Sequence, residues 1–285
     1  MKRAGRAVIL GVLAACLCAA ARAQPASPPV SRITWISGAP SERPGLALER
    51  EPFSLRLAAF IETRWPGVDH GVVTANALRA VKTLTEGEQA CVLAFAHTPE
   101  RERLAYFRDA LLVAPPVVVV RRDKLAALPR DAAGEVDLAR LFADRALRGA
   151  VVSDRSYGSF VDGQVRAAPG SGGLSTYAAN DFGSSIPAMV ALGRLDYSVV
   201  LEIDVELGRR STGPGALVGV PILGANTPGY AGVACPRTPW GQAVIRRVDT
   251  ILSSPEGAAL LRRETGYQMT PAARQRFAAQ FDAPR

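Results

Sequence analysis

Aromatic side chains are scarce in this sequence, and its basic residues do not gather in any one stretch. Phe, Trp and Tyr make up 6% of the 285 residues, and the 34 Lys and Arg residues are scattered along the chain. Nucleic-acid-binding surfaces typically combine a basic stripe with aromatic side chains on which bases stack. The composition therefore argues against a nucleic-acid partner.

Histidine and the common catalytic motifs are nearly absent as well. His70 and His97 are the only histidines, and neither has a metal-ligand partner at helical or short-range spacing. The glycine-rich stretch APGSGGLST lacks the lysine of a phosphate-binding loop, and no Gly-x-Ser-x-Gly elbow occurs. We therefore predict no metal, no cofactor and no enzymatic activity. A lone histidine such as His97 is more often a structural residue than a ligand.

Only the N-terminus contains a long apolar run. Residues 7–21, AVILGVLAACLCAAA, follow the basic residues Lys2, Arg3 and Arg6, and the run is too short to cross a bilayer comfortably. The Ala-Arg-Ala at 21–23 has the small-x-small form that signal peptidase cleaves, so residues 1–23 are predicted to be a signal peptide for export. One alternative remains open, because LAAC at 13–16 resembles a lipoprotein cleavage box that would leave Cys16 as a lipid anchor.

Cysteine is also rare, with four residues in the chain. Cys16 and Cys18 lie in the predicted signal peptide, so the exported protein keeps only Cys91 and Cys235. Two cysteines in an exported chain favour one disulfide bond, which would hold two distant segments in the same part of the fold. Two buried free thiols are the alternative.

Two stretches about a hundred residues apart share a helix–glycine–strand pattern. In the first, Leu78 and Leu84 mark one helix face, Gly87 is placed to end the helix, and the apolar strand ACVLAF follows. In the second, a helix ends at Gly193 before the strand LDYSVVLEI. The pattern predicts an α/β protein with parallel strands, built as two similar lobes.

The division into lobes follows from two β-branched runs. PPVVVVRRD at 115–123 and GALVGVPILGA at 215–225 are predicted to be strands that leave and re-enter the first lobe. The expected parts of the chain are a proline-rich flexible leader at 24–31, lobe I at 32–120 and 219–285, and lobe II at 121–218.

Three helices are expected to begin with a Thr-Pro pair, at Thr98, Thr238 and Thr270. The threonine hydroxyl can accept a hydrogen bond from an exposed N–H group, and proline fits the first helical position because its missing N–H would be unpaired there. The same local device is thus predicted at three helix starts.

The first of these helices carries Arg101 in its first turn, where the helix dipole disfavours a cation. A helix N-terminus beside a forked guanidinium would form an anion site that suits a carboxylate. Two other interpretations remain open: Glu100 and Glu102 neutralise Arg101 locally, or Arg101 points into water.

The stretch GEQACVLAFAHTPERERLAYFRDALLVAPPVVVVRRD resembles the signature region of the bacterial extracellular solute-binding proteins of family three. That region has a glycine turn, a strand, Thr-x-x-Arg at a helix start, an aromatic residue and a proline before a hydrophobic hinge strand. The matching positions are Gly87, 90–95, Thr98 with Arg101, Phe107 and Pro115-Pro116. The later stretches ALGRLDYSVV and YAGVACPRTPWGQAVIRRVDTIL resemble further elements of the family, and the likeness spans most of residues 32–265.

The resemblance implies a two-lobed periplasmic-binding-protein-like fold, with two crossing hinge strands and a small ligand in the cleft between the lobes. It implies that Arg101 grips the carboxylate of the ligand and that Thr98 assists. The matching loop of the second lobe, SDRSYGSF, supplies the candidate donors, which are Ser156, Tyr157, Gly158 and Ser159. A packed aromatic ring is the alternative role for Tyr157, and Asp196 fits a second-lobe pattern without an assigned role.

The expected function is a monomeric periplasmic receptor for a small, amino-acid-like carboxylate, which would serve the permease of an ABC importer. Two alternatives stay open. The first is an enzyme on the same fold that acts on small organic acids, with His97 beside the site. The second is a sensor or accessory protein with a membrane partner, because ISGAPSERPGLAL replaces the aromatic-Pro-Pro-aromatic element that usually follows the first strand of the family.

Overall fold

The computed structural model describes residues 29–38, 52–178, 185–212 and 216–281. The predicted signal peptide, with Cys16, and most of the leader lie outside these ranges. Within them, no helix is long and apolar enough to span a membrane.

The first lobe is built on a five-stranded sheet. Its strands are β1 (Arg32–Ser37), β2 (Asp69–Thr74), β3 (Ala90–His97), β4 (Ala105–Val113) and β10 (Gly229–Pro236). They are arranged in the order β2-β1-β3-β10-β4, with β1, β2 and β3 parallel and β10 antiparallel to both of its neighbours. The lobe therefore combines parallel strands joined by crossover connections with one antiparallel strand, β10, that returns to the sheet late in the chain.

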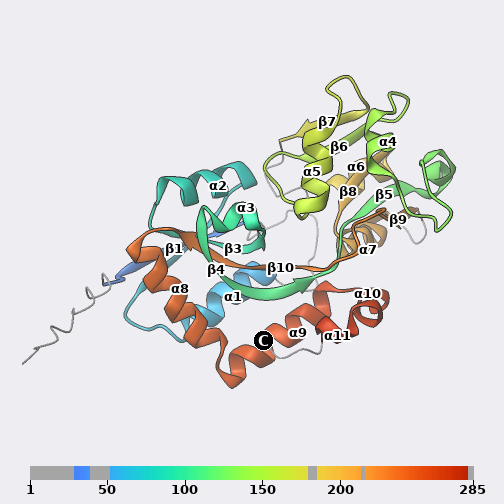
Figure 1. Ribbon diagram of the computed structural model, residues 1–285. Helices are drawn as coiled ribbons and strands as arrows, with labels where there is room; N and C mark the ends of the chain where they lie inside the picture. Colours follow the sequence, from blue (N-terminus) through green and yellow to red (C-terminus); the bar gives the residue numbers. More distant parts are fainter. Residues whose placement is uncertain (1–28, 39–51, 179–184, 213–215, 282–285) are drawn as a thin grey trace, which may run out of the picture.

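Helices cover both faces of this sheet (Figure 1). One face packs against α1 (Phe53–Glu62), α8 (Pro239–Leu252) and α9 (Pro255–Gln268), in a core that contains Trp35 and Trp240. The other face packs against α2 (Ala77–Glu86), whose Ala80 and Leu84 contact β3 side chains. Of the two residues expected to mark the buried face of α2, Leu84 is buried, but Leu78 is 58% exposed, so that part of the prediction is wrong; Ala80 occupies the buried face instead.

The second lobe contains a similar sheet. Its strands are β5 (Val117–Arg121), β6 (Gly149–Val152), β7 (Leu174–Tyr177), β8 (Tyr197–Val200) and β9 (Leu217–Pro221), in the order β7-β6-β8-β5-β9. One face carries α4 (Leu138–Ala143) and α5 (Ser159–Ala167), and the other carries α6 (Ile186–Ala191) and α7 (Glu202–Thr212). A short 3₁₀ helix, η1 (Arg122–Ala127), follows β5.

The chain passes between the sheets twice (Figure 1). The first passage joins β4 to β5 through Ala114, Pro115 and Pro116, and the second joins β9 to β10. The β-branched run at 115–123 was expected to leave lobe I as one strand, but all of β5 pairs within the second sheet. The strand of lobe I that leads into this passage is β4. It was not predicted from the sequence, because Arg108 and Asp109 interrupt its apolar pattern.

The C-terminal helices lie beside this passage. Helices α10 (Pro271–Arg276) and α11 (Ala278–Phe281) follow α9, and Phe277 packs in a small core with Leu112 and Ala114 at the end of β4. Arg276 also forms an ion pair with Glu202 of α7, at 3.5 Å. The end of the chain therefore contacts both lobes where they join.

The predicted helix caps are confirmed. The hydroxyls of Thr98, Thr238 and Thr270 each accept a hydrogen bond from the backbone N–H three residues later, with proline in the first turn. Gly87 and Gly193 follow their helices with φ values of +72° and +69°, a left-handed conformation that glycine adopts without a Cβ clash.

The predicted disulfide bond is also confirmed. Cys91 in β3 and Cys235 in β10 form a bridge across 144 residues of sequence, and both side chains are fully buried. Since β3 and β10 are neighbours in the sheet, the bridge ties the returning strand to the first half of lobe I.

Tyr197 in the second core offers a test of the packing. Its ring is fully buried and stacks on Phe142, and a Cβ on Gly149 would lie 2.0 Å from it, so position 149 needs glycine. Among the described residues, its hydroxyl has no hydrogen-bond partner. Burial of an unpaired hydroxyl costs free energy. Tyr197→Phe is therefore expected to raise the free energy of unfolding by about 1 kcal/mol in urea denaturation. A loss of stability would show that the hydroxyl has a partner.

Candidate ligand-binding site

Arg101 lies on a one-turn helix, α3 (Pro99–Glu102), between β3 and β4. Its side chain is not in bulk water: the residue is 8% exposed, and its guanidinium carbon lies 3.7 Å from the centroid of the Phe95 ring. Nη1 donates to the carbonyl of Ala96 at 3.1 Å, and Nη2 donates to the carbonyl of Asp154, in the second lobe, at 3.0 Å. The interpretation in which Arg101 points into water is therefore wrong.

The charge on Arg101 survives this burial. Loss of hydration lowers the pKa of Arg101 to about 10, and the nearby carboxylates of Asp162, Asp154 and Glu100 oppose that shift. Among the described residues, no carboxylate forms an ion pair with Arg101. Two backbone carbonyls account for two of the five N–H groups of a guanidinium. The remaining donors and the positive charge can serve an anion.

The opposite side of the contact is the loop between β6 and α5. Asp154 has a φ of +58°, and this unusual backbone conformation presents its carbonyl to Arg101. Nearby, Ser159 at the start of α5 donates from its hydroxyl to the carboxylate of Glu100, at 3.1 Å. Two adjacent residues of α3 therefore hold the second lobe directly.

Most of the donors predicted in this loop already have partners within it. The carboxylate of Asp162 accepts from the hydroxyl of Ser156 and from the backbone N–H of Tyr157, at 2.7 Å for the latter. The N–H of Gly158 donates to the Ser156 hydroxyl at 3.2 Å, and the Tyr157 hydroxyl accepts from the N–H of Val152 at 2.9 Å. Tyr157 is 5% exposed, and its burial raises the pKa of its phenol. The loop is thus a preformed structure, and Tyr157 packs within it.

Sequence reasoning missed several residues that shape the site. Phe95 forms the surface on which Arg101 lies, and Asp162 organises the loop. Arg155 pairs with Asp204 at 3.2 Å, and its guanidinium carbon lies 5.3 Å from the centroid of the Tyr157 ring. The charged run Asp-Arg at 154–155, inside the loop already singled out, was the available signal.

His97 lies beside the same turn. Its Nδ1 is 2.7 Å from Asp109, its Nε2 is 2.8 Å from Glu102, and its ring stacks on Phe107 with centroids 4.2 Å apart. Every polar atom of the ring is therefore engaged, as expected for a structural histidine.

Asp196, in contrast, lies at the other end of the second sheet. It directly precedes β8 and accepts hydrogen bonds from the backbone and side chain of Arg148, which directly precedes β6. The bonds from Arg148 lower the pKa of Asp196. Because β6 and β8 are parallel, this pair lies at their start, whereas the loop that faces Arg101 follows the end of β6. Asp196 is thus structural.

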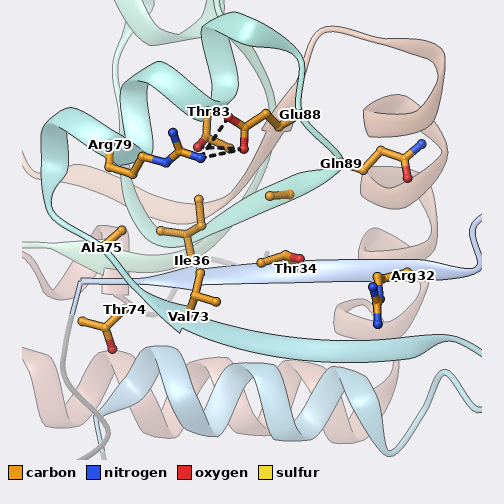
Figure 2. Close-up of a pocket in the computed structure, with 11 residues that line it drawn as sticks. Arg32, Thr34, Ile36, Val73, Thr74, Ala75, Arg79, Thr83, Glu88 and Gln89 are labelled. Atoms are coloured by element: carbon orange, nitrogen blue, oxygen red, sulfur yellow. Dashed lines mark hydrogen bonds and ion pairs between the residues drawn. The ribbon is translucent and has the colours of Figure 1, made fainter.

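A separate groove of about 480 Å³ lies in lobe I, between α2 and the strands β1 and β2 (Figure 2). Its charged side chains are paired within the protein: Arg79 donates to both carboxylate oxygens of Glu88 at 3.1 Å, and Arg32 pairs with Asp69 at 2.7 Å. Ile36 and Val73 form its apolar floor. Arg101 and the residues that contact it do not line this groove.

Across the described ranges, no three His, Cys, Asp or Glu side chains are grouped so that they could hold a metal ion.

Comparisons with known proteins identify the fold. No protein-family model and no curated protein matches the sequence. Solved structures do match: an amino acid ABC transporter substrate-binding protein from Streptococcus pneumoniae, bound to L-arginine, superposes with a TM-score of 0.60 over 89% of this chain and 97% of that one, at 12% identity.

Two further structures are similar. One comes from work on glutathione import via GshT and the cystine ABC importer TcyBC of Streptococcus mutans, with a TM-score of 0.62, 12% identity, and coverage of 84% of this chain and 95% of that one. The other is a histidine kinase sensor domain with similarity to periplasmic binding proteins, with a TM-score of 0.58, 18% identity, and coverage of 86% and 94%. The chain therefore has the two-lobed periplasmic-binding-protein fold.

Proposed function

We propose that the protein is an exported receptor that holds a small, carboxylate-bearing, amino-acid-like solute between its two lobes and delivers it to an ABC importer. The observation that carries the proposal is the buried, charged guanidinium of Arg101 at the contact between the lobes, with backbone carbonyls as its hydrogen-bond partners. A buried cation of this kind is stabilised by an anion that reaches its free N–H groups.

In this proposal the first lobe supplies the anchor. Thr98 caps the turn and holds the backbone N–H of Arg101 at 3.3 Å, so the arginine is fixed before the solute arrives. The loop with Ser156, Tyr157, Gly158 and Ser159 closes the site from the second lobe. Its internal hydrogen bonds keep the loop in shape, so that closure loses little conformational entropy.

The test is a thermal-shift screen of residues 24–285 against amino acids and small carboxylates, each paired with its carboxamide. At a hundred times the Kd, a ligand adds about 2.7 kcal/mol to the free energy of unfolding, which raises Tm by roughly 5–10 °C for a chain of this size. We expect at least one carboxylate to give such a shift and its carboxamide to give none. Equal shifts from the two forms, or no shift from any carboxylate, would contradict the proposal.

A second candidate is a sensor that uses the same site without transport. It is favoured by the similarity to the histidine kinase sensor domain. The importer hypothesis predicts that the loaded receptor stimulates ATP hydrolysis by a reconstituted permease, and the sensor hypothesis predicts that it does not. An enzymatic role for His97 has less support, because both ring nitrogens already contact carboxylates.

A further inference from the structure

The imidazole of His97 contacts two carboxylates at once. Nδ1 lies 2.7 Å from Oδ1 of Asp109, and Nε2 lies 2.8 Å from Oε1 of Glu102. A neutral imidazole carries one N–H donor and one lone pair, whereas an ionised carboxylate can only accept. The reference state is a neutral imidazole between two ionised carboxylates, in which only one of the two contacts can be a hydrogen bond. Both contacts are hydrogen bonds only when the three side chains together hold one additional proton. The geometry therefore defines a site for a single proton.

This site is joined to the turn that carries Arg101. Glu102 is the last residue of α3, which has four residues, and Arg101 directly precedes it. A single helical turn has little stability of its own. Its ties to the rest of lobe I are the Thr98 cap, the bond from Arg237 Nε to the carbonyl of Glu102, the contacts of the Arg101 guanidinium and the bond from His97.

The charged and titratable groups around His97 come from several elements. They are Asp109 and Arg108 on β4, Glu102 and Arg101 on α3, Arg237 before α8, and Tyr230 on β10, which is opposite His97 in register. The two carboxylates are the groups that directly contact the ring. The Arg108 and Arg237 side chains instead donate to the backbone carbonyls of Asp109 and Glu102.

We propose that His97, Asp109 and Glu102 form a proton-dependent positioning unit for Arg101. With the extra proton, His97 donates to both carboxylates and ties α3 to β4. When that proton leaves as the pH rises, one bond is lost. The bond to Glu102 is the weaker one, since the Glu102 side chain is 56% exposed and that of Asp109 is 34% exposed. The turn then loosens. For the carboxylate receptor proposed above, on which this consequence rests, solute affinity falls as the pH rises.

Glu102→Gln separates this mechanism from a general structural role. The amide of a glutamine can donate to the lone pair of a neutral Nε2, while Nδ1–H still donates to Asp109. The variant therefore keeps both contacts without the extra proton. We expect it to bind as well as the wild type does at low pH, but without the pH dependence. Glu86→Gln on α2, where the exposed carboxylate pairs with Lys82 at 3.7 Å, is the matched control.

The experiment needs no solute. Hydrogen exchange at the backbone N–H of Arg101 and Glu102, both bonded to the carbonyl of Thr98, is measured between about pH 5 and 8 and corrected for the intrinsic rate. In the wild type and in Glu86→Gln, protection is expected to fall roughly fivefold as the pH rises, the factor for one hydrogen bond. In Glu102→Gln, protection is expected to stay constant.

His97→Asn provides the second variant. An asparagine amide can replace Nδ1–H toward Asp109 but leaves Glu102 without a donor, so protection is expected to be low at every pH. The nitrogen-15 signals of the ring identify the proton, because the chain has two histidines and the His97 signals are those missing from this variant.

Protection that is independent of pH in the wild type, or that falls equally in Glu102→Gln, would overturn the proposal, even if the protein binds no carboxylate. If exchange behaves as expected and no carboxylate binds, the proposed receptor function fails while the positioning unit stands.

Discussion

Replacing Arg101 with alanine is expected to weaken solute binding about 30-fold or more. The guanidinium is charged and 8% exposed, so its bonds to a carboxylate would form largely out of water. Removal of one partner from a buried, hydrogen-bonded charge pair costs about 2–5 kcal/mol, and each 1.4 kcal/mol is a tenfold change in Kd. Isothermal titration calorimetry with the best carboxylate of the thermal-shift screen measures the effect.

Two further variants show whether the loss is specific. Arg101→Lys keeps the charge but loses the planar fork, so we expect an intermediate affinity. Arg103→Ala removes an exposed arginine two residues away and is expected to bind as the wild type does. Circular dichroism and Tm check that each variant is folded, since Arg101→Ala also removes the bonds to the carbonyls of Ala96 and Asp154. A Kd for Arg101→Ala within about twofold of wild type would remove Arg101 from the site.

Loss of the disulfide bond is expected to have the largest effect on stability. Cys91 and Cys235 are separated by 144 residues, and their bridge joins β3 to the strand that returns from the second lobe. Removal of a native disulfide typically costs about 2–5 kcal/mol, mainly because the unfolded chain gains freedom. The double variant Cys91→Ala/Cys235→Ala is therefore expected to lower the free energy of unfolding by about that amount in urea denaturation.

The controls for this prediction use the predicted mature protein, residues 24–285, which has no other cysteine. Thiol labelling after denaturation without reductant is expected to find no free thiol in the wild type. A reductant is expected to lower the stability of the wild type to that of the double variant and to leave the double variant unchanged. Equal stability of oxidised and reduced wild-type protein would show that the bridge does not stabilise the fold.

Much of the fold could be predicted because local chemistry specifies it. Thr98 before proline and Gly87 after an apolar helix face give the helix boundaries without any tertiary information. The run Val117–Val120 forms a buried interior strand, between β8 and β9, because β-branched side chains pack well on both faces of a sheet. The pairing of Cys91 with Cys235 followed from the lack of any other cysteine in the predicted mature chain.

The details of the candidate site depend on contacts that local sequence does not specify. The carbonyl of Asp154 meets Arg101 across 53 residues of sequence, and only the docking of two lobes brings them together. Strand β4 was missed because Arg108 and Asp109 break its apolar pattern, although Arg108 pairs with Asp249 and Asp109 contacts the His97 ring in the fold. The hydrogen bonds from Ser156 and Tyr157 to the carboxylate of Asp162 could not be predicted either, since a loop sequence does not show which of its donors are already paired.

A crystal structure of residues 24–285 with the best carboxylate of the screen tests the central claim most directly. We predict that the solute lies between the lobes, with its carboxylate within hydrogen-bond distance of the Arg101 guanidinium and close to the Thr98 cap. A solute bound elsewhere, for example in the groove beside Arg79 and Glu88, with Arg101 still bonded only to the carbonyls of Ala96 and Asp154, would contradict the account.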